Sequence, residues 1–212
     1  MKYEKLESIK GFLHGGDYNP DQWLDRPEIL DEDIRLMKQA GVNVVTLGVF
    51  SWSSYEPTEG VFQFDWLDSM MDRLYENGIH VILATPSGGK PPWMAKKYPE
   101  TMRMREDRVR HHYSDRENQC NSSKIYREKV RIIDEKLAER YHNHPALIMW
   151  HISNEIYGTC HCPQCQENFR AWLKQKYGTI EELNRQYWSR FWSHQYSDWS
   201  EIESPAAGIG EQ

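Results

Sequence analysis

The stretch VNVVTLGVF, residues 42–50, decides the fold class of this chain. It is rich in β-branched side chains and almost continuously hydrophobic, whereas a strand with one wet face would alternate apolar and polar residues. Such a run is typical of a strand that is buried on both faces, as the strands of a parallel sheet are. Because parallel strands need long crossover connections, we expect helices before and after residues 42–50.

Strand-like and helix-like segments do alternate on both sides of this run. The expected strands are residues 11–16, 42–50, 79–85 and 146–152, and the amphipathic stripes of the expected helices run over residues 30–40, 67–74, 125–137 and 169–177. Four βα units in strict alternation predict a parallel sheet with right-handed crossovers. An open doubly wound sheet and a closed (β/α)8 barrel both fit. No glycine-rich phosphate motif follows any of these strands, which weakens the nucleotide-binding folds.

Composition narrows the class of protein further. The chain has 212 residues, is 39% hydrophobic and carries a net charge of −6, which argues against a nucleic-acid partner. No apolar run approaches 18 residues, and the first ten residues lack the apolar core of a secretory signal, so we expect no membrane span and a cytoplasmic protein. Aromatic residues make up 13%. They fit either a packed core or sugar-stacking platforms, for which Trp52 and Trp93 are the candidates.

The segment WHISNE, residues 150–155, carries the strongest catalytic signal. An apolar strand ends there in Asn154 and Glu155, and barrel enzymes place their reactive groups at the carboxyl ends of strands. Glycoside hydrolysis needs a carboxylic acid that protonates the departing oxygen, a role that a partly buried Glu155 would suit. Asn154 is expected to donate its amide to a sugar hydroxyl. The competing interpretation is an ordinary loop and helix cap.

All four cysteines of the chain fall into one pattern, in which Cys160, Cys162 and Cys165 have C-x-C-x-x-C spacing and Cys120 is distant. Without a secretory signal, disulfides are not expected, whereas four thiolates are a complete tetrahedral ligand set for Zn2+. No position is left for water, so the predicted zinc is structural. The alternatives are four unrelated thiols, or His161 in place of one cysteine.

A long polar stretch, residues 86–118, separates the third strand from the next helix. A connection of that length is usually functional, although most of its charges fit a solvated loop. Arg116 differs because it lies four residues before Cys120. If a metal holds Cys120 beside the loop after the fourth strand, Arg116 comes close to Glu155, where it could hydrogen-bond a sugar hydroxyl.

These residues resemble glycoside hydrolase family 42, the bacterial and archaeal β-galactosidases. The matching stretches are GDYNPDQW (residues 16–23), the segment from Phe50-Ser51-Trp52-Ser53 to Glu56-Pro57, Thr85-Pro86, Pro91-Pro92-Trp93, Asn154-Glu155 and Cys162-Pro163-Gln164-Cys165. The resemblance runs from about residue 11 to residue 204. It implies a (β/α)8 TIM barrel, of which residues 1–212 would hold about the first four βα units as a partial catalytic domain.

The resemblance also implies a retaining double-displacement mechanism on β-galactosides or galacto-oligosaccharides. By motif, Glu155 matches the proton donor, and Asn154 and Arg116 match residues that hold the substrate. The four cysteines match zinc ligands found in many members, which are often homotrimers. The family's nucleophile is a glutamate on a later strand, and this chain stops before the matching region. We therefore expect the 212-residue chain alone to be inactive.

Two other functions stay open at this point. One is a β-glycosidase with a different sugar preference, because a barrel with Asn-Glu after a strand is common to many glycosidase families. The other is a non-catalytic, zinc-stabilised module for carbohydrate binding or assembly.

Overall fold

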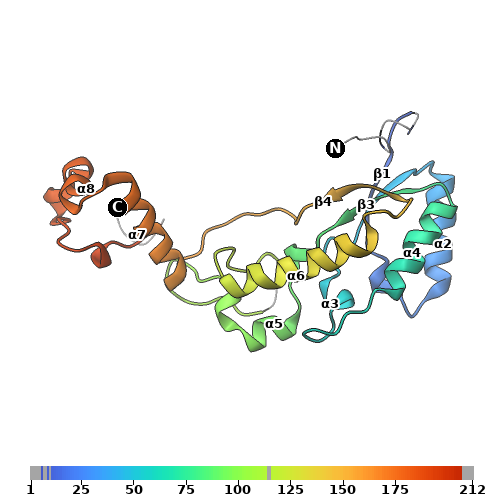
Figure 1. Ribbon diagram of the computed structural model, residues 1–212, viewed down its shortest axis with the longest axis horizontal. Helices are drawn as coiled ribbons and strands as arrows, with labels where there is room; N and C mark the ends of the chain where they lie inside the picture. Colours follow the sequence, from blue (N-terminus) through green and yellow to red (C-terminus); the bar gives the residue numbers. More distant parts are fainter. Residues whose placement is uncertain (1–5, 7–8, 10, 114–115, 207–212) are drawn as a thin grey trace. The chain divides into compact units, whose positions relative to one another are not determined.

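The computed structural model describes residues 6, 9, 11–113 and 116–206 and contains a four-stranded parallel sheet (Figure 1). The strands, in the order in which they lie side by side, are β1 (Gly15–Tyr18), β2 (Val44–Leu47), β3 (His80–Ala84) and β4 (Leu147–His151). Each strand pairs in parallel with the next one along the chain. This is the order of a (β/α)8 barrel, whereas a doubly wound sheet reverses its order at a switch point. The predicted parallel sheet is confirmed, as the first four βα units of a barrel.

The first strand lies later in the sequence than predicted. Its pairing with β2 begins at Gly15, whereas the apolar run suggested residues 11–16. Phe12, the largest apolar residue of that run, is 85% exposed and does not contribute to the core. A short apolar run is therefore a poor guide to strand position when the pairing register with a neighbour decides where the strand begins.

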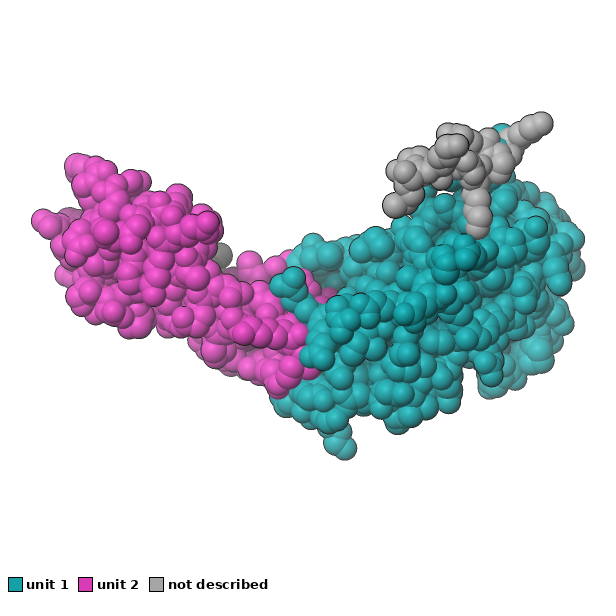
Figure 2. All heavy atoms as spheres, viewed as in Figure 1, with its two compact units in different colours: residues 1–99, 114–117, 127–157 teal, residues 100–113, 118–126, 158–212 magenta. Residues whose placement is uncertain are grey.

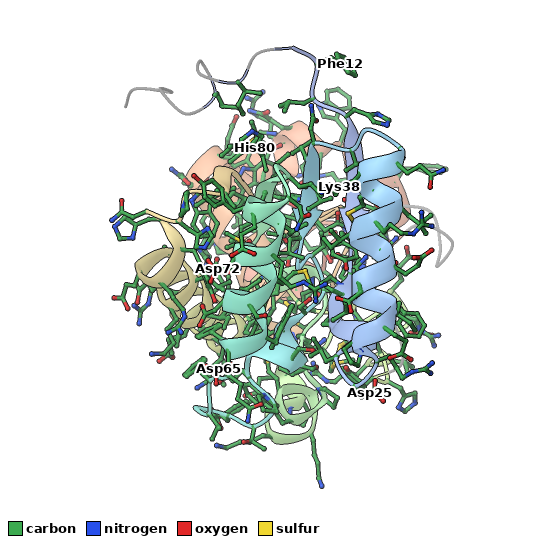
Figure 3. All side chains as sticks on the ribbon, turned by 90° about the vertical axis from the view of Figure 1, so that its right-hand side faces the viewer. Phe12, Asp25, Lys38, Asp65, Asp72 and His80 are labelled. Atoms are coloured by element: carbon green, nitrogen blue, oxygen red, sulfur yellow. The ribbon has the colours of Figure 1, made fainter. Side chains whose placement is uncertain are left out.

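Helices connect the strands and form one layer beside the sheet. They are α2 (Pro27–Gln39), α4 (Asp65–Glu76) and α6 (Lys124–Tyr141). Figure 3 shows α2 and α4 running side by side. Arg73 of α4 reaches Asp31 of α2 at 2.6 Å, and Arg140 of α6 donates to Asp68 of α4 at 2.7 Å. Gly41 follows the end of α2 with a φ of +71°, a backbone conformation that glycine adopts without steric strain.

One face of the sheet is packed and the other is more open. Leu47 and Leu83 are buried, as the continuous hydrophobicity predicted. Thr46, Ile82 and Met149 are register partners on adjacent strands and therefore share the opposite face, where Met149 is 45% exposed. In a closed barrel this face is the interior, which side chains from all the strands fill together. Four strands alone cover it incompletely, because on this face Val44 of β2 is buried whereas Met149 of β4 is not. The prediction of burial on both faces therefore holds for one face and in part for the other.

The remaining helical segments are mostly short. They are η1 (Pro20–Trp23), α3 (Trp52–Tyr55), η2 (Pro86–Gly88), α5 (Pro92–Lys97), η3 (Pro99–Thr101), α7 (Pro163–Tyr177), α8 (Ile180–Tyr187), η4 (Ser189–Trp192) and η5 (Trp199–Glu201). The stretch 86–118, expected as one long loop, thus contains η2, α5 and η3. Proline begins η2 and α5, because its fixed φ suits a first helical position that needs no N–H. Every helix of the described residues is too short or too polar to span a membrane.

The chain divides into two compact units (Figure 2). Unit 1 contains the whole sheet and comprises residues 1–99, 114–117 and 127–157, and unit 2 comprises residues 100–113, 118–126 and 158–212. Unit 2 has an apolar cluster of its own, built from Leu173 of α7, Leu183 of α8 and Ile202. That residues 1–212 form a single partial catalytic domain stays a prediction.

Candidate active site and metal centre

A strained turn after β4 carries Asn154 and Glu155. Ser153 and Glu155 have φ values of +58° and +38°, a region that residues other than glycine seldom occupy. The Ser153 N–H donates to Oγ1 of Thr85 at 2.8 Å, which ties the end of β4 to the end of β3. Strain of this kind persists where the surroundings enforce it, and it concentrates at functional sites. The turn thereby holds the Glu155 carboxyl at the carboxyl edge of the sheet.

Arg116 meets Glu155 at this edge. The Arg116 Nη2 atom lies 2.7 Å from Oε2 of Glu155, and its guanidinium carbon lies 5.3 Å from the ring centroid of Phe50. The structure therefore brings together the two residues that the sequence predicted to be close, although they are far apart in the chain. Sequence reasoning missed Phe50. Its position three residues after the end of β2 was the available signal, because the parallel strands β2 and β4 end at the same edge of the sheet.

Both side chains are more accessible than expected. Glu155 is 58% exposed and Arg116 is 48% exposed, whereas the acid role suggested partial burial of the carboxyl. The reason is topological, because β4 is an outer strand of the sheet and no described strand lies beyond it. In this chain the carboxylate is thus open to solvent and to a ligand.

The two candidate platform tryptophans differ in their surroundings. Trp52 is fully buried, and its indole N–H donates to Oε2 of Glu56 at 2.9 Å. It is a core residue and cannot stack on a sugar. Trp93 is half-buried, and its indole N–H donates to the backbone carbonyl of Glu56 at 2.9 Å. Both indoles thus anchor the segment around Glu56.

The four cysteine sulfurs form a compact group. All four Sγ atoms lie within 4.8 Å of one another, and Cys120 is 3.6 Å from Cys162 and 3.5 Å from Cys165. A disulfide would need about 2.05 Å, so these contacts are not bonds. Tetrahedral Zn2+ with Zn–S distances of about 2.3 Å places its sulfurs about 3.8 Å apart. The donor set and its spacing therefore fit zinc.

Local structure converges on this cluster from two segments. The Cys120 N–H donates to the carbonyl of Thr101 at 2.8 Å. Cys162 occupies the N-cap position of α7, a proline follows it, and Cys165 lies in the first turn of that helix. Cys160 accepts a hydrogen bond of 3.4 Å from the Met104 N–H. The close C-x-C-x-x-C spacing thus presents three sulfurs from one helix start, and Cys120 supplies the fourth.

Electrostatics also favour a cation among these sulfurs. A hydrogen bond from the Cys120 thiol and another from the Met104 N–H lower the pKa of Cys160 to about 4, whereas burial raises the pKa of Cys165 to about 11. Four adjacent thiolates would repel one another strongly without a cation between them. A divalent metal ion removes that repulsion and displaces the remaining protons.

His161 is not among the candidate ligands. It is buried, its Nδ1 atom lies 2.9 Å from Oγ of Ser204, and the metal-sized group of the described residues contains only the four cysteines. Ser204 also accepts a hydrogen bond of 2.8 Å from the Gln166 side-chain amide. His161 therefore helps to attach the segment around Ser204 to the start of α7.

Parallel βα units in barrel order, with a carboxylate and an arginine paired where the strands end, define part of a (β/α)8-barrel enzyme. Comparison with known families identifies the enzyme family to which the chain belongs. The chain belongs to glycoside hydrolase family 42, whose family model, described as beta-galactosidase, matches residues 17–210.

Individual relatives agree with this assignment. The chain is 58% identical over 198 residues to the beta-galactosidase BglY of Alicyclobacillus acidocaldarius and 56% identical over 200 residues to the beta-galactosidase GanA of Bacillus subtilis. These alignments cover 93% and 94% of this chain but only 29% and 30% of the relatives. Among solved structures, Gan42B, a GH42 beta-galactosidase from G. stearothermophilus, superposes with a TM-score of 0.92 at 55% identity. That superposition covers 97% of this chain and 30% of Gan42B. The chain thus spans about 30% of the length of its relatives.

Proposed function

We propose that this chain supplies the acid–base half of the active site of a retaining β-galactosidase, an enzyme that hydrolyses terminal non-reducing β-D-galactose residues of β-galactosides. One observation carries the proposal beyond family membership. The Glu155 carboxylate lies 2.7 Å from the Arg116 guanidinium at the carboxyl edge of the sheet. Asn154 precedes it on the same turn, so an acid, a cation and an amide are available to one sugar.

In this proposal Glu155 protonates the glycosidic oxygen in the first step and deprotonates the attacking water in the second. The Arg116 guanidinium presents several N–H donors to sugar hydroxyls. The Asn154 amide donates to the 2-hydroxyl, a bond that strengthens as the oxocarbenium-like transition state forms. The exposure of Glu155 and Arg116 leaves both within reach of a substrate.

Retention requires a second carboxylate, about 5–5.5 Å from the acid, that acts as nucleophile. Glu56 and Asp17 are early acidic residues of this chain. Glu56 is buried and accepts hydrogen bonds from the Trp52 indole and from the Gly60 N–H, so it acts as a structural acceptor. Asp17 lies in β1 and matches no nucleophile motif. We infer that the nucleophile comes from a part of the enzyme outside these 212 residues.

Cys120, Cys160, Cys162 and Cys165 would together hold one Zn2+. When bound, the metal supplies a cross-link between the segment at Cys120 and the start of α7. With four thiolates it has no open position, so its role is structural and not catalytic. Assembly into a homotrimer, which the family resemblance implies, stays a prediction.

The test is hydrolysis of a panel of nitrophenyl β-glycosides by the complete gene product, with NMR identification of the first anomer released. We expect the galactoside to be hydrolysed fastest, with the β-anomer as first product. A tenfold or greater preference for another sugar would replace galactosidase activity by another β-glycosidase activity. Sugar binding without turnover on any substrate would instead favour the non-catalytic module.

A further inference from the structure

The contact between Arg116 and Glu155 requires that the Arg116 side chain be held in a defined position. Both side chains are about half exposed, and exposed ion pairs between flexible side chains hold their geometry poorly. The Phe50 ring lies beside the guanidinium, 5.3 Å from its carbon to the ring centroid. The backbone next to Arg116 shows a further way in which this side chain is directed toward the edge of the sheet.

The next residue, Glu117, is buried and held in place by its backbone. It is only 2% exposed, although carboxylates are rarely buried. Its φ of +56° places it in the left-handed region, where a residue other than glycine is strained. The Glu117 N–H donates to the carbonyl of Gly88 at 3.0 Å, which fixes this residue against η2. The chain therefore turns sharply at Glu117, and the surrounding contacts maintain this strained backbone conformation.

Gly88 makes this arrangement possible. A Cβ atom at Gly88 would lie 2.5 Å from Oε1 of Glu117, 3.2 Å from the Phe50 ring and 3.3 Å from Cβ of Asn154. Its φ is outside the left-handed region, so only the lack of a side chain matters here. The Glu117 carboxylate, the Phe50 ring and Asn154 therefore all lie close to Gly88, beside the proposed site.

We propose that Glu117 is a positioning residue, whose buried carboxylate and bond to Gly88 hold the turn from which Arg116 reaches Glu155. Glu117 is too buried to touch a sugar, so its effect on a substrate passes through the neighbouring Arg116. The inference rests on the proposed role of Arg116 in substrate binding. It predicts that Glu117 affects affinity for the substrate and that this effect disappears once Arg116 is removed.

The kinetic test compares variants of the complete gene product on nitrophenyl β-galactoside. For Glu117→Ala we expect KM to rise about tenfold and kcat to change less than about twofold, because a displaced Arg116 weakens binding in the ground and transition states alike. Glu117→Gln keeps the shape of the side chain and should restore most of the affinity. Glu135→Gln is the matched control, since Glu135 is an exposed residue of α6 paired with Arg131. It should stay within twofold of the wild type.

A double-variant cycle separates positioning from general damage to the fold. If Glu117 acts through Arg116, Arg116→Ala with Glu117→Ala should have the same KM as Arg116→Ala alone. Independent structural damage would instead multiply the two losses. That outcome, or a Glu117→Ala variant with unchanged KM, would overturn the proposal.

Crystal structures of the variants decide the same question without any substrate. In Glu117→Ala we expect the contact of 2.7 Å between Arg116 and Glu155 to be lost. If Glu117→Ala does not fold, Glu117→Asp serves instead, because it keeps the charge and withdraws the carboxylate by one methylene group without touching Phe50 or Asn154. An intact contact in the variant would refute the positioning role. An enzyme inactive on galactosides would refute the proposed function alone, since the crystallographic result would still stand.

Discussion

Two glutamates of unit 1 show how surroundings decide the use of a carboxylate. Glu56 is buried, and both of its oxygens accept hydrogen bonds, one from the Trp52 indole and one from the Gly60 N–H. Glu155 follows an outer strand and faces Arg116 and solvent. A carboxylate whose two oxygens already accept hydrogen bonds from the protein stabilises the fold. A solvent-accessible carboxylate beside a cation is free to bind a substrate. Residue type alone does not separate these two cases.

At this scale the first prediction concerns Glu155→Gln in the complete gene product. The amide keeps the shape but removes the proton that the leaving group needs. We expect kcat/KM to fall by about 10²–10⁴-fold for lactose, whose leaving group is poor, and far less for dinitrophenyl galactoside, which departs with little protonation. Steady-state kinetics on the two substrates measure the difference. Equal losses on both would remove Glu155 from the role of general acid.

At the scale of elements, α6 carries a carboxylate in an unfavourable position. Oδ1 of Asp134 is buried and accepts no hydrogen bond from the described residues. Burial raises the pKa of Asp134 to about 7. The helix therefore holds a group whose charged form opposes folding at neutral pH.

We predict that Asp134→Asn stabilises the protein at pH 8 and not at pH 4. In the unfolded chain an aspartate ionises near pH 3.9, so the wild type loses stability between about pH 4 and pH 7 and stays weaker above that range. Asparagine remains neutral throughout. After allowance for solvent near this partly exposed side chain, we expect a gain of about 1 kcal/mol at pH 8. Thermal midpoints of the complete gene product and of its Asp134→Asn variant at pH 4 and pH 8 measure this gain. A difference that does not depend on pH would contradict the prediction.

The cysteine cluster joins the segment at Cys120 to the start of α7, which makes metal removal a test of how these elements are held. We expect about one zinc per chain in protein purified without added metal. Chelation should lower Tm, and added zinc should restore it, because binding to the folded state alone stabilises that state. Cys165→Ser should lower zinc content and Tm together. Zinc-free protein with four freely titrating thiols in the folded state would refute the site.

At the scale of the whole molecule, this chain presents surfaces that a complete barrel encloses. β1 and β4 are the two outer strands of the sheet, and Met149 lies on the open face. After β4, Ile152 and Ile156 are also largely exposed. Unpaired strand edges beside apolar side chains are templates for association between chains.

We therefore predict that residues 1–212 expressed alone self-associate or precipitate and do not hydrolyse lactose or nitrophenyl galactoside. Only one of the two carboxylates that retention needs is proposed to lie in this chain. Analytical ultracentrifugation and both assays measure the outcome. A soluble monomer with the turnover of an ordinary glycosidase would refute the proposal that the chain holds half of a site.

Much of the fold was predictable because its signals are local. Continuous hydrophobicity over residues 42–50 predicts a parallel strand, since apolar periodicity reports burial directly. The stop of α2 at Gly41 follows in the same way from the backbone freedom of glycine. The cysteine spacing predicted a metal-sized cluster, because three of its members lie within six residues of one another. In each case the feature depends on residues that are close together in the sequence.

Other features were decided only by the tertiary structure. Trp52 fitted a platform or a core equally well until packing buried it. The meeting of Phe50, Glu117 and Asn154 around Gly88 depends on where the turns after three separate strands end, to within an ångström. The left-handed backbone of Glu117 has no signal in its residue type. Local sequence determined which elements form, whereas contacts between residues distant in the chain decided which side chains share a site, because only pairing and packing bring those residues together.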